Sequence, residues 1–215
     1  MSAVKDIKLI IFDLDGTLVD AYRAIIKSVN FTLLKFAYPR CPDSKIRRAV
    51  GWGDTKLLSA FIEEGDISSA LKVYRCHHRQ SLRKYSRLLP FTKGLLDYLI
   101  AKGCRLAIAS NRPTEFTGII LRHLKIKKYF DYVLCADKLT HGKPHPEILN
   151  KILAKLAVKK EEALYVGDMA IDVEAARNAG IKSIAVRGGS STLSEIKKAR
   201  PFKIIKNLAF LKSCL

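Results

Sequence analysis

The sequence contains no long hydrophobic run, no closely spaced cysteine pair and few acidic residues. No apolar run approaches the roughly 20 residues that a membrane-spanning helix requires, and the first residues, MSAVKDIK, lack the apolar core of a signal peptide. The five cysteines are widely spaced and form no CxxC pair, which favours reduced thiols over disulfides. These absences argue against a membrane protein and a disulfide-stabilised domain, and they predict a soluble cytoplasmic protein.

Negative charge is scarce as well. The chain has 20 Asp and Glu residues against 39 Lys and Arg residues, which gives a formal net charge of +19. Such a surface attracts anions, for example phosphorylated metabolites, nucleic acid or acidic lipid. The basic runs are short and no RNA- or DNA-binding motif accompanies them. The charge therefore indicates a basic, solvated surface in preference to a nucleic-acid interface.

The chain does contain short apolar runs that alternate with helical patterns. The runs are LIIF (9–12), RLAIA (105–109), YVLC (132–135), ALYV (163–166), SIAV (183–186) and KII (203–205). Helical patterns cover residues 92–103, 146–156 and 170–180. This alternation predicts an α/β fold with a doubly wound parallel sheet. With 215 residues, the chain suits one large domain or one domain with an insert.

One stretch breaks the alternation. Residues 18–88 contain no convincing strand pattern. Their helical patterns cover about 20–36, 43–50, 54–63 and 67–87. We therefore predict a helical cap, residues 18–88, inserted into a catalytic core made of residues 1–17 and 89–215.

Polar residues follow the predicted strands. Asp13 and Asp15 follow the first run, Ser110 and Asn111 the second, Lys143 lies in the loop after the third, and Asp168 follows the fourth. Each alone also fits a turn, a helix cap or an exposed lysine. In open parallel sheets, ligands bind beyond the carboxyl ends of the strands. The joint occurrence of three carboxylates, a hydroxyl and an ammonium at that edge therefore predicts a catalytic site.

These residues resemble the four motifs of the haloacid dehalogenase superfamily of phosphatases. DxDGT matches DLDGT at 13–17, the serine after an apolar strand matches Ser110, the motif lysine matches Lys143, and GDxxxD matches GDMAID with Asp168 and Asp172. The match runs in order over essentially the whole chain. A finer likeness, in VGDMAIDVEAARNAG, KPHPEIL and VGWGDTKLL, is to phosphoglycolate phosphatases. The resemblance implies a Rossmann-like core with a helical cap.

The resemblance also implies a phosphoric monoester hydrolase that uses Mg²⁺. Asp13 would attack phosphorus and form an aspartyl-phosphate. Asp15 would protonate the leaving alkoxide and then activate the hydrolytic water. The metal would be held by Asp13, by the backbone carbonyl of Asp15 and by Asp168, with Asp172 orienting the groups around it.

Further residues are implied in substrate binding. Ser110 and Lys143 would hold the phosphoryl oxygens as charge shifts in the transition state. The implied contacts to substrate and phosphate come from Leu14, Ser110, Asn111, Lys143 and, in the cap, Trp52. Arg47 and Arg48 of the cap are candidates for contacting a carboxylate, as glycolate would require.

The predicted function is Mg²⁺-dependent hydrolysis of a small phosphomonoester, phosphoglycolate or a related phosphometabolite. The same residues would serve a phosphosugar mutase similar to β-phosphoglucomutase. A nucleotidase or a nucleic-acid-end phosphatase would combine this chemistry with the basic charge. We expect a small phosphorylated metabolite as partner, no membrane association, nucleic acid only as a disfavoured alternative, and a monomer or homodimer.

Overall fold

A parallel sheet forms the core of the computed structural model, which describes residues 6–215. The sheet has the strand order β5-β4-β1-β6-β7-β8, and each neighbouring pair is parallel. Its strands are β1 (Leu9–Phe12), β4 (Arg105–Ser110), β5 (Tyr132–Cys135), β6 (Ala163–Gly167), β7 (Lys182–Val186) and β8 (Lys203–Ile205). The predicted doubly wound parallel sheet is confirmed, and each strand agrees with its predicted run to within one residue.

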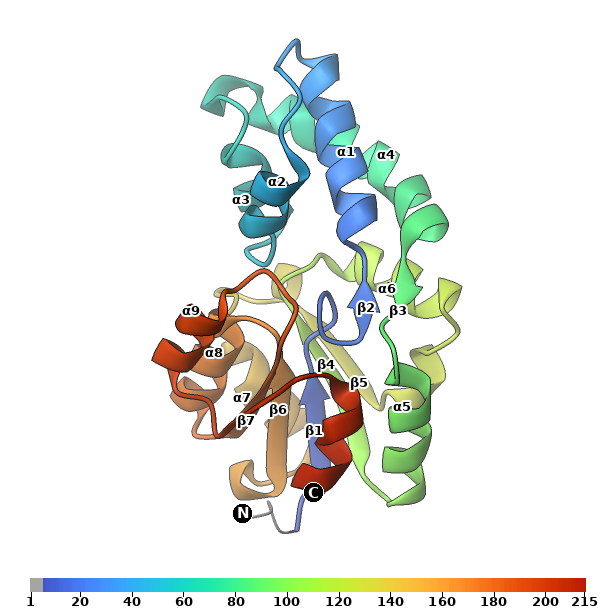
Figure 1. Cartoon of the computed structure of the whole chain (residues 1–215), viewed down its shortest axis with the longest axis vertical. Helices are drawn as coiled ribbons and strands as arrows, with labels where there is room; N and C mark the ends of the chain where they lie inside the picture. The colour runs from blue at the N-terminus through green and yellow to red at the C-terminus, as the bar shows by residue number, and fades with distance from the viewer. Residues whose placement is uncertain (1–5) are drawn as a thin grey trace.

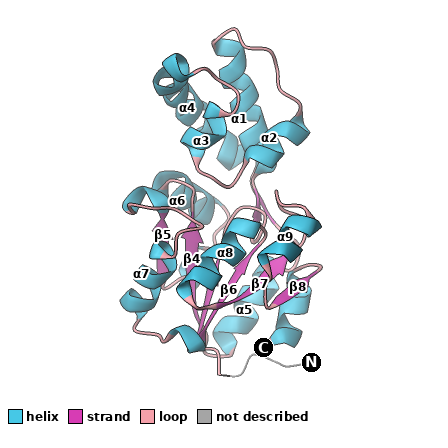
Figure 2. Ribbon diagram, turned by 90° about the vertical axis from the view of Figure 1, so that its left-hand side faces the viewer, coloured by secondary structure: helices cyan, strands magenta, loops and turns pink. Residues whose placement is uncertain are grey.

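Helices cover both faces of the sheet, as Figure 2 shows. They are α5 (Thr92–Ala101), α6 (Thr114–His123), α7 (Glu147–Leu156), α8 (Ala170–Ala179) and α9 (Leu193–Ala199). Short 3₁₀ turns lie at Lys127–Tyr129, Ala136–Lys138, Lys160–Glu162 and Leu208–Cys214. The sequence analysis did not identify α6 and α9. Among the described residues, no helix combines the length and hydrophobicity needed to cross a bilayer.

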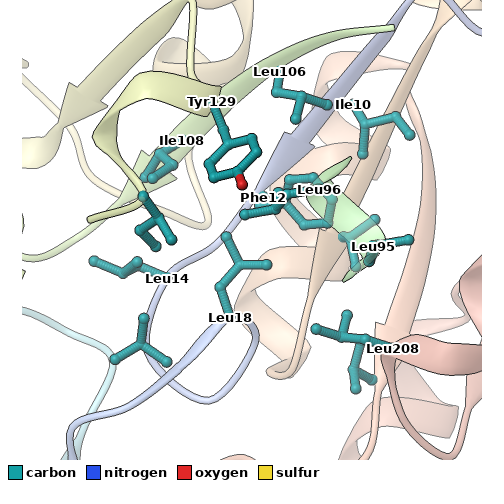
Figure 3. Close-up of a cluster of buried hydrophobic side chains, with 14 of the residues drawn as sticks. Ile10, Phe12, Leu14, Leu18, Leu95, Leu96, Leu106, Ile108, Tyr129 and Leu208 are labelled. Atoms are coloured by element: carbon teal, nitrogen blue, oxygen red, sulfur yellow. The ribbon is translucent and has the colours of Figure 1, made fainter. Parts of the chain in front are cut away.

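Strand β1 lies at the centre of the sheet and is fully buried along its length. Ile10 and Phe12 face the apolar cluster that includes α5, part of which Figure 3 shows. Leu9 and Ile11 face the opposite cluster, which α7 and α8 cover. Burial on both faces explains why the strand reads as a continuous apolar run. Each such side chain contributes about 1.5–3 kcal/mol on burial, so the strand is a rigid support for the residue that follows it, Asp13.

Residues between β1 and α5 form a separate group of helices above the sheet (Figure 1). They are α1 (Tyr22–Lys35), α2 (Asp43–Ala49), α3 (Asp54–Ser59) and α4 (Ile67–Tyr85), with a 3₁₀ turn at Glu64–Asp66. These helices pack around their own apolar cluster, which includes Tyr22, Ile25, Val29, Leu58 and Tyr74. Because this cluster is distinct from those of the sheet, the helices form a second layer with its own core.

The chain enters and leaves this layer through a two-stranded ribbon. Strand β2 (Val19–Asp20) pairs antiparallel with β3 (Arg87–Leu88). The carbonyl oxygen of Leu18 accepts hydrogen bonds from the Leu89 N–H and the Thr92 hydroxyl, each at 2.9 Å. The expectation that residues 18–88 contain no strand is therefore wrong. Two-residue strands are too short to show the alternation that identifies a strand in a sequence.

Candidate active site

A cavity lies between the helical layer and the carboxyl edge of the sheet. Its floor comes from the loops that follow β1, β4 and β6 and from the Lys143 loop, and its roof comes from α1, α3 and α4 and the turn before α3. The lining includes Asp13, Asp15, Ser110, Asn111, Arg112, Lys143 and Asp172 below, and Ile25, Val50, Gly51, Asp54, Leu57 and Tyr74 above. The predicted polar edge of the sheet therefore faces this cavity.

Lys143 joins the buried carboxylates of this edge. Its Nζ donates to Asp13 Oδ1 at 2.6 Å and to Asp172 Oδ1 at 2.7 Å. It also contacts the Tyr165 hydroxyl at 3.0 Å and the Ala109 carbonyl oxygen at 3.1 Å. The ammonium group is almost completely buried. Acceptors from β4, β6 and the loop after β1 hold it at a fixed position. Lys143 is therefore not an exposed surface lysine.

Burial and crowding shift the pKa values of these groups. Burial raises the pKa of Asp13 to about 7, against the opposing effect of Lys143. Burial also raises the pKa of Asp168 well above its usual value, and the charges of Asp13 and Asp172 raise it further. The pKa of Lys143 is lowered by burial but raised more strongly by Asp13 and Asp172, so the lysine stays charged. The site thus carries excess negative charge that a bound cation would stabilise.

Asp168 has one carboxylate oxygen without a protein partner. Its Oδ1 accepts a hydrogen bond from the Thr17 hydroxyl at 2.9 Å, whereas its Oδ2 is buried and unpaired. A side chain at Gly189 or at Gly16 would collide with this oxygen. Oxygen atoms of Asp13, Asp168 and Asp172 lie within 4.8 Å of one another. An unpaired buried carboxylate oxygen beside a second carboxylate, next to glycines, fits a divalent cation that takes oxygen ligands.

Asp172 is satisfied by protein donors on both oxygens. Besides Lys143, its Oδ1 accepts from the Tyr165 hydroxyl at 2.9 Å. Its Oδ2 accepts from the backbone N–H groups of Asp168 at 3.2 Å and Met169 at 3.0 Å. The carboxylate thereby fixes both the turn that presents Asp168 and the ammonium of Lys143. The orienting role of Asp172 toward a metal stays a prediction.

Asp15 is held by an arginine that the sequence analysis missed. Arg112 Nε donates to Asp15 Oδ2 at 2.6 Å, and Arg112 Nη1 donates to His78 Nε2 of α4 at 2.8 Å. Burial, followed by the charge of Arg112, lowers the pKa of His78 well below its usual value, so its ring is neutral. Because Nε2 accepts, Nδ1 carries the proton and donates to Ser28 of α1 at 3.0 Å. This chain of bonds connects Asp15 to the helical layer.

We expect Arg112→Met to lower the free energy of unfolding by about 3 kcal/mol, because breaking a buried ion pair leaves an uncompensated charge. The matched control is Arg79→Met, which removes the exposed pair between Arg79 and Glu115 and should change stability by less than about 1 kcal/mol. Urea denaturation of both variants provides the measurement. Equal stability of the two variants would contradict a structural role for the Arg112–Asp15 pair.

Ser110 and Asn111 end β4 at the cavity. The Ser110 hydroxyl is buried and accepts a hydrogen bond from the Arg112 N–H at 3.2 Å. The Asn111 amide donates to the carbonyl oxygens of Gly51 at 3.0 Å and Lys143 at 3.1 Å, and it accepts from the Lys143 N–H at 2.8 Å. Asn111 therefore joins the Lys143 loop to the helical layer. The Leu14 side chain is buried in the apolar core, so only its backbone is available to a ligand.

Three predicted substrate contacts lie outside the cavity. Trp52 does not line it, although its neighbours Gly51 and Gly53 do. Its ring is 41% exposed and lies beneath Lys56, 5.2 Å from the ring centroid. The structure therefore does not bring Trp52 to the site.

The two arginines are used elsewhere. Arg48 forms an ion pair with Glu195 at 2.7 Å, and Arg47 lies over the Tyr22 ring and donates to the Gly188 carbonyl oxygen. The expectation that they meet a substrate carboxylate is wrong for this arrangement. The cations that line the cavity are Arg112 and Lys143.

The fold and this cluster of buried carboxylates around a lysine define an α/β protein with a candidate catalytic site at the carboxyl edge of its parallel sheet. The sequence profile described as haloacid dehalogenase-like hydrolase matches residues 10–186. The chain therefore belongs to the haloacid dehalogenase-like hydrolases. The predictions of this family and of a phosphoric monoester hydrolase are confirmed.

Relatives within the family include phosphoglycolate phosphatases. The chain is 32% identical to the phosphoglycolate phosphatase of Vibrio parahaemolyticus, over 96% of this chain and 95% of that protein. It is 30% identical to that of Aquifex aeolicus, over 93% and 95% respectively. A crystal structure described as a predicted phosphoglycolate phosphatase from Haemophilus somnus 129pt superposes with a TM-score of 0.91 at 27% identity, covering 97% of this chain and 98% of that one.

Proposed function

We propose that this protein is a Mg²⁺-dependent phosphatase that hydrolyses phosphoglycolate, or a related small phosphomonoester, through an aspartyl-phosphate on Asp13. The observation that carries the proposal is the unpaired, buried Oδ2 of Asp168 beside Asp13. An enzyme that attacks a phosphate dianion with a carboxylate needs a cation between them, and this pair of oxygens supplies a place for it. The names of the relatives support phosphoglycolate as the substrate.

The mechanism assigns one task to each side chain. Asp13, fixed at the end of the buried β1, attacks phosphorus and becomes the phosphorylated residue. Asp15, oriented by Arg112 at 2.6 Å, gives a proton to the leaving alkoxide and then takes one from the water that hydrolyses the intermediate. Ser110 and the Lys143 ammonium hold the phosphoryl oxygens as negative charge shifts toward the leaving group.

Mg²⁺ fits the donor set because it prefers oxygen ligands. Asp13, Asp168 and the backbone carbonyl of Asp15 would hold it. When bound, it would neutralise charge on the phosphoryl group. Asp172 would keep its position as the residue that orients Asp168 and Lys143.

We propose that residues 18–88 act as a cap that closes over the phosphoryl group. The closed arrangement is supported by contacts between the two layers: Arg48 with Glu195, Arg79 with Glu115, His78 with Arg112, and Tyr22 with Ser190. Closure excludes water and places the roof residues against the leaving group. Arg112 is then the cavity-lining cation available to the carboxylate of a glycolate group. A cytoplasmic location and a monomeric or homodimeric state stay predictions.

A phosphate-release screen with Mg²⁺ tests the proposed function. The panel comprises phosphoglycolate, sugar phosphates, nucleotides, a 3′-phosphorylated oligonucleotide and pyrophosphate. Phosphoglycolate should give the highest kcat/KM. Isomer formation from a sugar phosphate without phosphate release would replace the phosphatase with a mutase, and a preference for nucleotides or oligonucleotides would replace phosphoglycolate as the substrate.

We expect Asp168→Asn to remove Mg²⁺ binding without destabilising the fold. The amide oxygen still accepts the Thr17 hydrogen bond, and the substitution removes a buried negative charge from a crowded site. Mg²⁺ should raise the melting temperature of the original protein but not that of the variant, and chelation should abolish activity of the original protein. Full activity in excess chelator, or an unchanged Mg²⁺-induced shift in the variant, would contradict the metal assignment.

A further inference from the structure

The loop that carries Lys143 brings two histidines and a glutamate together at the surface. Ligand atoms of His141, His145 and Glu147 all lie within 4.8 Å of one another. The two imidazole rings have centroids 4.6 Å apart. Both histidines are exposed, and Glu147 is half-buried. None of these three residues has a task in the proposed phosphatase mechanism.

Hydrogen bonds position Glu147 and the ring of His145. Glu147 Oε1 forms an ion pair with Lys151 at 2.7 Å, while Glu147 Oε2 accepts from the His141 backbone N–H at 2.9 Å and lies 3.7 Å from His141 Nδ1. The Glu147 N–H donates to His145 Nδ1 at 3.2 Å, which places this nitrogen beside Glu147. Glu147 and the His145 ring are therefore positioned close together before any ligand binds, which lowers the cost of binding.

We propose that His141, His145 and Glu147 form a surface site for a transition-metal dication, separate from the buried carboxylates of the active site. Two imidazoles and one carboxylate, with a remaining position open to water, are a donor set for Zn²⁺. Imidazole nitrogen also binds Ni²⁺ and Cu²⁺, whereas Mg²⁺ prefers oxygen ligands alone. The ion displaces the long Glu147–His145 hydrogen bond, and Glu147 Oε2, on the side away from Lys151, is the carboxylate ligand.

The site has a defined relation to Lys143. His141 and His145 flank this lysine at two residues on either side, and the Lys143 ammonium points inward to Asp13 and Asp172. An ion bound by both histidines therefore links the chain before Lys143 to the chain after it. It restrains the segment that delivers Lys143 without touching the lysine side chain.

Trp52 provides a local probe of this site. It is the single tryptophan of the chain. It lines the same surface hollow as His141, Pro144 and His145. Because Ni²⁺ is paramagnetic and quenches indole emission at short range, its binding at the histidines should reduce Trp52 fluorescence. Zn²⁺ is diamagnetic, so it should compete with Ni²⁺ and restore the emission.

The experiment is a Ni²⁺ titration of the full, tag-free chain in excess Mg²⁺, followed by Trp52 fluorescence and repeated with Zn²⁺ as competitor. We expect saturable quenching whose apparent Kd rises in His141→Ala and in His145→Ala by at least the roughly 10- to 100-fold that loss of an outer-shell partner costs a metal site, because each histidine is a direct ligand. The matched control is His123→Ala, an exposed histidine at the end of α6 outside the hollow, which should leave Kd unchanged.

Three results would overturn the proposal. They are no saturable quenching in the original protein, an unchanged Kd in both histidine variants, or loss of binding in Asp168→Asn, which would place the ion at the buried carboxylates. Circular dichroism confirms that each variant is folded, which we expect because both histidines are exposed. The titration needs no substrate, so its outcome is independent of the phosphatase assay.

Discussion

Asp13→Asn is expected to lower turnover by roughly four to six orders of magnitude, the scale on which a covalent catalyst responds to loss of its nucleophile. An amide is a poor nucleophile toward phosphorus. The fold should be retained, because the amide oxygen still accepts the hydrogen bond that Lys143 donates to Asp13. The pKa of the Asp13 carboxyl is raised to about 7 because burial disfavours its charged form. Replacing this carboxyl by an uncharged amide should therefore leave the metal-free protein at least as stable as the original.

Steady-state phosphate release and urea denaturation test this expectation together, with deamidation excluded by mass spectrometry. The control is Asp43→Asn, at an exposed position in α2, which makes the same chemical change away from the cavity and should leave turnover unchanged. Turnover of Asp13→Asn within about tenfold of the original would assign the nucleophile to another residue.

Asp15→Asn should separate the two chemical steps. An alkyl alkoxide leaves poorly without a proton, so the first step on an alkyl phosphate should be slowed by about 10²–10⁴-fold. An aryl phosphate has a better leaving group and needs less help in that step. Its second step still needs a water activated by Asp15. The variant should therefore release the aryl alcohol once per site and then accumulate phosphorylated Asp13.

Rapid-quench kinetics would show this as a burst close to the enzyme concentration, with almost no burst from an alkyl substrate. Asparagine is preferred to alanine because its side-chain oxygen can still accept the hydrogen bond from Arg112. Alanine would leave the buried Arg112 without this acceptor. Mg²⁺ affinity must be measured in parallel, since the backbone of residue 15 is a proposed ligand. Slow turnover with no burst and no trapped phosphoenzyme would refute the double role of Asp15.

The positions along the sheet edge could be predicted from the sequence because each is set by local order. Asp13 and Ser110 directly follow apolar runs, and Asp168 follows one after Gly167. Parallel strands bring their carboxyl ends to the same edge. The strand boundaries, and hence these positions, follow from hydrophobicity alone. Lys143 lies in the loop after the third run, so a strand boundary does not fix its position, and the network around its ammonium now places it at the same edge.

The contacts between the two layers could not be predicted in the same way. Arg112 reaches Asp15 and His78, which are far from it in the sequence and come together only when α4 packs against α6. The sequence shows a charged residue two positions after Ser110, but it does not indicate which residues that charge contacts. Trp52 illustrates the converse: the resemblance implied a substrate contact, yet Gly51 and Gly53 line the cavity while Trp52 lines a separate surface hollow.

The ribbon of β2 and β3 gives the helical layer the topology of a loop inserted at a single point. The chain leaves the sheet after β1 and returns to it before α5 at adjacent positions, joined by the pairing of Val19 with Leu88. The two ends of the helical segment therefore lie as close together as the two ends of a hairpin turn. Replacement of this segment by a short turn would leave the path of every strand of the large sheet unchanged. Exchange of one helical insert for another thus requires no change in the path of those strands.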